Sequence, residues 1–243
     1  MIRWELFCVF AVSLGASALN ALLSLVGSLL ARQSLSSQQA QLVGPLATNS
    51  WLDLALQLAS IAEALAPVVL VFYLLARTGE GPRDMGLDTT QPALDTARGA
   101  VLAAVIGGAG LGLYLAAFHL GLSLTVVPES LPAVWWRIPV LVLSAAHDGI
   151  LEEILVIGYL LRRLDQLGWN PWKAIVCSAV LRGSYHLYQG FGAFIGNAVM
   201  GLIFGYLYRR WGRVTPLIIA HTLIDTVTFV GYAALHGRVS WIP

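Results

Sequence analysis

Long runs of apolar residues separated by short polar stretches dominate the pattern along the chain. Seven of these runs reach or approach the length of about 18–20 residues that a helix needs to cross the hydrocarbon of a bilayer. The runs are 6–31, 51–75, 100–122, 134–161, 172–188, 191–208 and 214–235. Backbone groups in a bilayer must be hydrogen-bonded internally, which helices achieve by themselves. We therefore predict an all-α fold: a polytopic transmembrane helix bundle of about seven spanning helices, forming a single membrane domain over residues 1–243.

The polar stretches between the runs set the expected topology. With the N-terminus in the cytoplasm, ten Lys and Arg residues fall on the inner side and three on the outer side. Basic residues accumulate in cytoplasmic loops, so we predict a cytoplasmic N-terminus. We expect residues 77–98 to form a long solvated inner loop and residues 123–131 a short outer loop. This asymmetry fits an integral, multi-pass protein of a bacterial cell inner membrane, although a membrane of the endoplasmic reticulum would fit as well.

Composition supports a membrane protein and excludes other classes. Apolar residues make up 58% of the chain, charged residues 11%, and the mean hydropathy is +0.75. A water-soluble domain does not carry this much apolar material. The net charge of +1 gives no reason to expect a nucleic-acid partner, whereas membrane lipids must surround the bundle. Cys8 and Cys177 both lie within apolar runs and show no metal-ligand spacing.

Several ionisable residues interrupt the apolar runs. A charge in a bilayer costs at least about 2.5–3.5 kcal/mol, so each of them needs an explanation. Three runs, the fourth, fifth and seventh, carry most of them: His147, Asp148, Glu152 and Glu153; Arg182 and His186; His221 and Asp225. A buried polar network that only ties helices together is the structural alternative. Such hydrogen bonds contribute only about 0.6 kcal/mol each on average, which favours a functional site.

The spacing of these residues predicts that they meet. Asp148 and Glu152, Arg182 and His186, and His221 and Asp225 are each four residues apart, so each pair shares one helix face. Counted from the inner ends of the helices at 1.5 Å per residue, the polar groups lie about 12–20 Å deep. We therefore expect one polar layer, slightly to the cytoplasmic side of the midplane, around a shared cavity.

The order of these residues resembles a known family. Glu152-Glu153 on one helix, His186 on the next and His221-x-x-x-Asp225 on a later one resemble the EExxxR, FxxxH and HxxxN/D motifs of the CAAX prenyl protease and bacteriocin-processing (CPBP, or Abi) family of intramembrane glutamate proteases. The resemblance covers roughly residues 145–230. It implies a catalytic core of helices within 131–236, preceded by variable N-terminal helices within 1–130.

Two positions depart from the family pattern. Ile157 stands where the family has the Arg of EExxxR, and Arg182 stands where it has the Phe of FxxxH. A cation is therefore missing from the fourth helix and present in the fifth, at the depth of Glu153. Our hypothesis is that Arg182 forms a structural ion pair with Glu153 and replaces the missing arginine.

The resemblance implies a role for each matching residue. Glu152 would be the general base that activates water, with His186 helping to hold that water. His221 and the residue at position 225 would stabilise the oxyanion. Because an ionised Asp225 cannot donate a hydrogen bond, we expect it to orient His221, which would donate. The substrate would be a protein or peptide at the membrane, and some relatives act on lipid-modified, prenylated CAAX proteins. The sequence does not choose between these, bacteriocin-type leader peptides and membrane-protein tails.

Three other functions use the same residues. Glu, His and Asp side chains are also zinc ligands, so a metal-dependent intramembrane protease is the first alternative. The chain has no HExxH helix, and Arg182 would repel a dication, so our prediction is an enzyme without a cofactor. Buried acids and histidines also relay protons in ion-coupled transporters, but no inverted repeat is visible. An inactive, substrate-binding relative is the third alternative.

Overall fold

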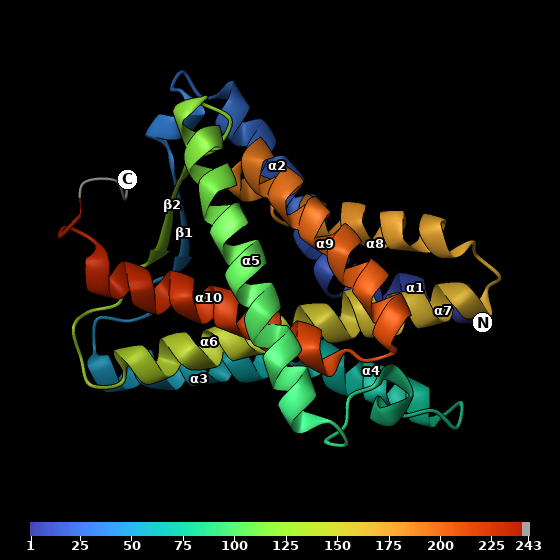
Figure 1. Ribbon diagram of the computed structural model, residues 1–243. Helices are drawn as coiled ribbons and strands as arrows, with labels where there is room; N and C mark the ends of the chain where they lie inside the picture. The colour runs from blue at the N-terminus through green and yellow to red at the C-terminus, as the bar shows by residue number, and fades with distance from the viewer. Residues whose placement is uncertain (240–243) are drawn as a thin grey trace.

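The computed structural model describes residues 1–239, and almost all of its ordered elements are helices (Figure 1). This confirms the predicted all-α class. The helices are α1 (Ile2–Ala11), α2 (Leu14–Leu30), α3 (Ser50–Ala64), α4 (Ala66–Ala76), α5 (Pro92–His119), α6 (Arg137–Glu152), α7 (Leu160–Gln166), α8 (Pro171–Ser184), α9 (Phe191–Trp211) and α10 (Thr215–Leu235). A π-helical segment, Glu153–Tyr159, joins α6 directly to α7.

Every predicted apolar run contains helix, but not every run is one regular span. Ser50–Ala76, Pro92–His119, Phe191–Trp211 and Thr215–Leu235 are long and apolar enough to cross a membrane. The first run is bent by 48° between α1 and α2, and the pair counts as a fifth candidate if it is one span. The protein is therefore an integral membrane protein, whereas the count of seven spans and the cytoplasmic N-terminus stay predictions.

Both predicted loops contain regular structure that the sequence analysis missed. The inner loop is shorter than predicted, because α5 already begins at Pro92, where the fixed φ angle of proline suits the first turn of a helix. The outer loop contains β2 (Thr125–Glu129), which pairs in parallel with β1 (Gln39–Val43), Ala40 lying opposite Val126. This pairing joins residues more than eighty positions apart, so no local pattern could reveal it.

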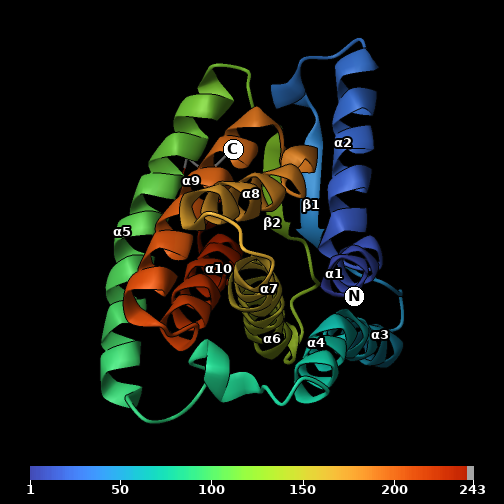
Figure 2. The same cartoon turned by 90° about the vertical axis from the view of Figure 1, so that its right-hand side faces the viewer.

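The segment from α6 to α7 runs through the middle of the bundle. Figure 2 shows it nearly end-on, with α5, α9 and α10 to one side and α1 to α4 to the other. The helices α6 and α10 approach closely at Gly149, where a Cβ atom would lie only 2.6 Å from the Thr222 hydroxyl and 3.1 Å from the Ile218 carbonyl. A residue with no side chain is therefore required where these two site-bearing helices cross.

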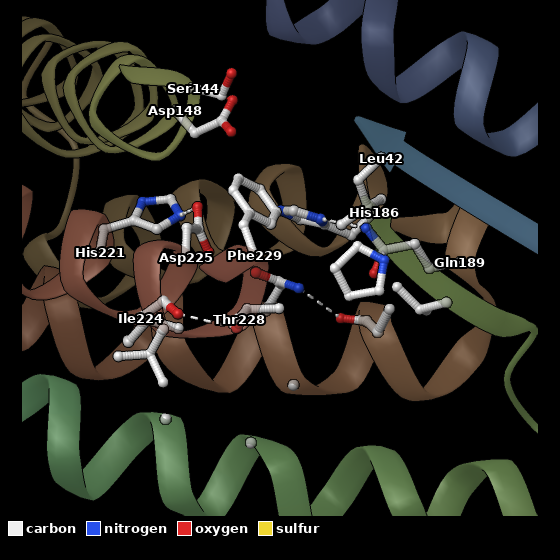
Figure 3. Close-up of a pocket in the computed structure, with 18 of the residues that line it drawn as sticks. Leu42, Ser144, Asp148, His186, Gln189, His221, Ile224, Asp225, Thr228 and Phe229 are labelled. Carbon is white, nitrogen blue, oxygen red and sulfur yellow. Dashed lines mark hydrogen bonds and ion pairs between the residues drawn. The ribbon is translucent and has the colours of Figure 1, made fainter. Parts of the chain in front are cut away.

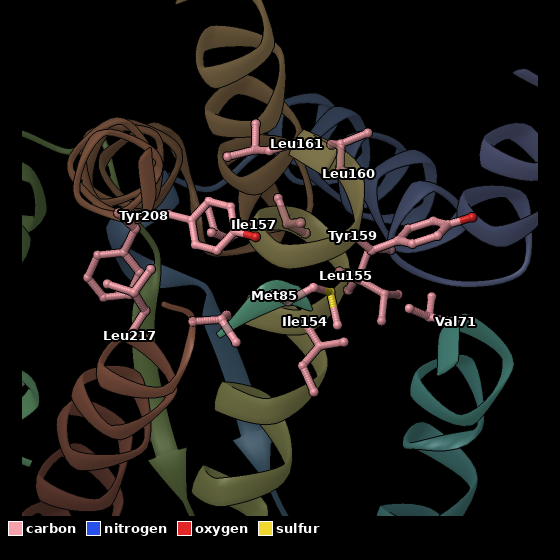
Figure 4. Close-up of a cluster of buried hydrophobic side chains, with 14 of the residues drawn as sticks. Val71, Met85, Ile154, Leu155, Ile157, Tyr159, Leu160, Leu161, Tyr208 and Leu217 are labelled. Atoms are coloured by element: carbon pink, nitrogen blue, oxygen red, sulfur yellow. The ribbon is translucent and has the colours of Figure 1, made fainter. Parts of the chain in front are cut away.

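The π-helical segment is held from two sides. Ser178 of α8 donates a buried hydrogen bond of 2.8 Å to the carbonyl of Val156, in the middle of the segment. Around it lies the main hydrophobic cluster, in which Leu155 and Ile157 are fully buried (Figure 4). At its far end, Tyr159 and Arg163 both donate to Glu5 of α1 at 2.7 Å. Glu152, the last residue of α6, and Glu153, the first residue of the π-helical segment, are thus positioned by a rigid element.

Candidate active site

A cavity of about 1250 Å³ opens between α2, α5, α6, α9 and α10. Its wall is mostly apolar, and on α5 it consists largely of alanine and glycine. Among the described residues, the ionisable side chains of acidic or histidine type that line it are His147, Asp148, Glu152, His186, His221 and Asp225. Figure 3 shows Asp148 of α6, His186, and His221 with Asp225 of α10 around this space. The predicted shared cavity is therefore present.

Glu152, at the end of α6, has its two carboxylate oxygens in different surroundings. Its Oε2 accepts a hydrogen bond of 2.7 Å from the Tyr185 hydroxyl and lies 3.3 Å from Nη2 of Arg182. Its Oε1 lies 3.7 Å from Nε2 of His186, which is too long for a direct hydrogen bond. Although only 9% of the side chain is exposed, it belongs to the cavity wall. One oxygen is thus held by α8, and the other faces a histidine across a gap that suits a water molecule.

Arg182 and Glu153 are in contact behind the cavity wall. Nη2 of Arg182 donates to Oε1 of Glu153 at 2.6 Å, and both side chains are 0% exposed. Nδ1 of His221 lies 2.8 Å from the same carboxylate oxygen and 3.0 Å from the same guanidinium nitrogen. The contact expected from the paired departures at positions 157 and 182 is therefore present, and His221 is its third member.

His221 is held through both ring nitrogens. While Nδ1 faces Glu153 and Arg182, Nε2 lies 3.2 Å from Oδ2 of Asp225, one turn further along α10. The side chain of Asp225 is 22% exposed and that of His221 is 6% exposed, so the acid lies at the cavity and the imidazole lies deeper. This arrangement fixes the orientation of the His221 ring, as predicted for Asp225, but it leaves neither nitrogen without a protein neighbour.

His147 and Asp148 lie in the cavity wall about one turn before Glu152. Nδ1 of His147 is 3.0 Å from the Ser144 carbonyl and 3.4 Å from Oδ1 of Asp148. If Nδ1 carries the proton that this carbonyl accepts, Nε2 is the basic nitrogen of the neutral ring. Both residues therefore shape the polar side of the cavity without a direct hydrogen bond to Glu152.

The structure brings together all the residues that the sequence singled out, and it adds one. Glu152 and Glu153 come from α6 and the start of the π-helical segment, Arg182 from α8, and His221 with Asp225 from α10. His186 is not on the helix itself, because α8 ends at Ser184 and His186 follows in the next turn. The added residue is Tyr185, which lies at one of the unspecified positions of the FxxxH motif. In the sequence, the only feature that could have pointed to Tyr185 is its position next to His186.

Fold and site together define an integral membrane helical bundle with acids and histidines gathered at an internal cavity. Residues 133–227 match the family described as type II CAAX prenyl endopeptidase, Rce1-like. Over this part of the chain the protein is therefore similar to a CAAX protease family, in agreement with its resemblance to the CPBP family. The family is one of peptidases that act on proteins or peptides, and the matched region contains all six residues of the predicted site. Searches of curated proteins and of solved structures found no match.

Proposed function

We propose that this protein is an intramembrane endopeptidase in which Glu152 activates water to cleave a peptide bond. The observation that carries the proposal is the pair formed by Oε1 of Glu152 and Nε2 of His186, 3.7 Å apart at the wall of the cavity. A water molecule at about 2.8 Å from each would be within hydrogen-bond reach of a base and of a second polar group. A base within this reach is what the activation of a water molecule for peptide hydrolysis requires.

The reaction then proceeds through a tetrahedral intermediate. Glu152 takes a proton from the water, and the hydroxide oxygen attacks the carbonyl carbon of the peptide, whose oxygen becomes an oxyanion. When the carbon–nitrogen bond breaks, the protonated Glu152 returns its proton to the leaving amine. The products are an amine and a carboxylic acid, which carries the second proton of the water until it ionises and releases that proton to solvent.

Stabilisation of the oxyanion is assigned to His221. Its Nε2, which faces Asp225 at 3.2 Å, would share its proton with the oxyanion at the cavity wall. Asp225 keeps the ring oriented and favours a proton on this nitrogen. Glu153 and Arg182 hold the opposite edge of the ring, and they are structural because neither lines the cavity.

The substrate that fits best is a peptide segment associated with the membrane. The cavity is apolar except at the polar cluster, so an apolar segment or a lipid chain attached to the peptide would be accommodated beside the reacting bond. We further propose that the reaction uses no metal ion. Within residues 1–239 no three His, Cys, Asp or Glu side chains converge as ligands, and the Arg182 cation already neutralises Glu153. The basic residues at the inner ends of the apolar runs fit a bacterial inner membrane and a membrane of the endoplasmic reticulum equally well.

The test is cleavage by the purified protein and by its Glu152→Gln variant, which keeps the shape of the side chain but removes the base. Membrane extract from the source organism supplies the candidate substrates, and new peptide termini are identified by mass spectrometry. We expect cleavage by the unmodified protein and a loss of at least about 100-fold in the variant, as is typical of general-base removal. Equal cleavage by the two proteins would refute the role of Glu152. A pH-dependent ion flux in vesicles without cleavage would instead favour a transporter.

A further inference from the structure

Tyr185 occupies a position that the proposed reaction does not explain. It is 5% exposed, lines the cavity, and follows the last residue of α8. Its hydroxyl donates to Oε2 of Glu152 at 2.7 Å, the shortest contact that this carboxylate makes. The ring centroids of Tyr185 and His186 are 4.8 Å apart. One side chain therefore contacts both members of the pair between which the water would lie.

The hydrogen bond decides which carboxylate oxygen faces the water. A carboxylate is symmetric, and rotation about its last torsion is a soft motion that exchanges its two oxygens. Tyr185 holds Oε2, with Arg182 beyond it at 3.3 Å, and this leaves Oε1 turned towards His186. Nε2 of His186 is buried without a hydrogen-bond partner among the described residues. A buried polar atom of this kind is expected to bind a ligand such as water.

We propose that Tyr185 is a positioning residue for the reaction: its hydroxyl fixes the Glu152 carboxylate so that Oε1 and His186 Nε2 together hold the attacking water. This inference rests on the proposed peptidase function. Tyr185 acts through Glu152 and does not itself touch the reacting atoms. A base that is held in one orientation is ready to react in a larger fraction of the enzyme–substrate complexes. Loss of the Tyr185 hydroxyl should therefore lower kcat, while KM, which reflects substrate binding, changes little.

The test is Tyr185→Phe, which removes the hydroxyl and keeps the ring beside His186. A hydrogen bond to a charged group contributes enough that we expect kcat to fall about 10- to 100-fold while KM stays within about twofold. Incorporation of 3-fluorotyrosine at position 185 restores a hydroxyl and should recover most of the activity. The matched control is Tyr159→Phe, because Tyr159 is also buried and donates to Glu5 at the same distance of 2.7 Å, away from the cavity.

Three results would separate the possibilities. A wild-type kcat in Tyr185→Phe, with Glu152→Gln inactive, overturns the role of Tyr185 and leaves the proposed function standing. Equal loss of kcat in Tyr159→Phe shows a general effect on stability and also overturns it. Thermal unfolding of Tyr185→Phe, Glu152→Gln and the double variant gives a readout without any substrate. Additive changes in Tm would overturn the assignment even if no peptide were cleaved, whereas non-additive changes support it.

Discussion

The ion pair between Arg182 and Glu153 allows the most direct test of the structure. Both side chains are 0% exposed, and the guanidinium nitrogen lies 2.6 Å from the carboxylate oxygen. Arg182→Met removes the cation and leaves the carboxylate buried beside His221. Breaking a buried pair in this way costs about 3–5 kcal/mol, most of it from the charge that is left unpaired. We expect this loss in the free energy of unfolding in detergent.

A second substitution, Glu153→Gln, shows whether the unpaired carboxylate causes the loss in the free energy of unfolding. Glu153→Gln removes the unpaired charge, so the double variant should regain part of the stability that Arg182→Met lost. Recovery should be incomplete, because Nη2 of Arg182 also lies 3.0 Å from His221 and 3.3 Å from Glu152. The coupling free energy between the two positions should therefore exceed about 0.5 kcal/mol, the usual error of additivity between independent sites.

The assay is a double-mutant cycle measured by denaturant or thermal unfolding of the purified protein. Arg210→Met is the control, because this arginine is exposed at the end of α9 and its loss should change stability by no more than about 0.5 kcal/mol. If the effects of Arg182→Met and Glu153→Gln simply add, the two side chains do not interact, and the explanation of the departures at positions 157 and 182 is wrong.

Three further outcomes are expected. Cleavage should survive 1,10-phenanthroline at concentrations that inactivate a zinc protease, and loss of activity that zinc restores would favour the metal-dependent alternative. Gly149→Ala should destabilise the protein by about 1–3 kcal/mol, because the added methyl group meets Thr222 where α6 and α10 cross, and an unchanged Tm would contradict this packing. Outside the membrane-spanning helices, a hydrogen bond from Arg213 lowers the pKa of Asp88 below its usual value of about 3.9. A carboxyl whose pKa is lower in the folded state stabilises the protein above its unfolded-state pKa and loses that effect as the pH falls through the folded-state pKa. The Tm of the unmodified protein should therefore fall more steeply below about pH 4 than the Tm of Asp88→Asn, and parallel pH profiles would contradict the role of Arg213.

The sequence by itself determined the class of protein and most of the site. Apolar runs of membrane-spanning length leave few options for the backbone, because each peptide group in a bilayer must be hydrogen-bonded within the segment. Charges in such runs are costly, so the few that occur drew attention to Glu152, His186 and His221. The four-residue spacings then predicted which side chains share a face, and the missing arginine at position 157 predicted the contact of Arg182 with Glu153.

The tertiary structure decided what depends on contacts between distant segments. The pairing of β1 with β2 and the crossing of α6 and α10 at Gly149 join residues far apart in the sequence, and neither leaves a local pattern. The same holds for the two oxygens of Glu152, whose different roles come from Tyr185 and His186 on another part of the chain. Periodicity can place a side chain on one face of a helix, but only the packing of the helices determines which atoms face each other across the gap.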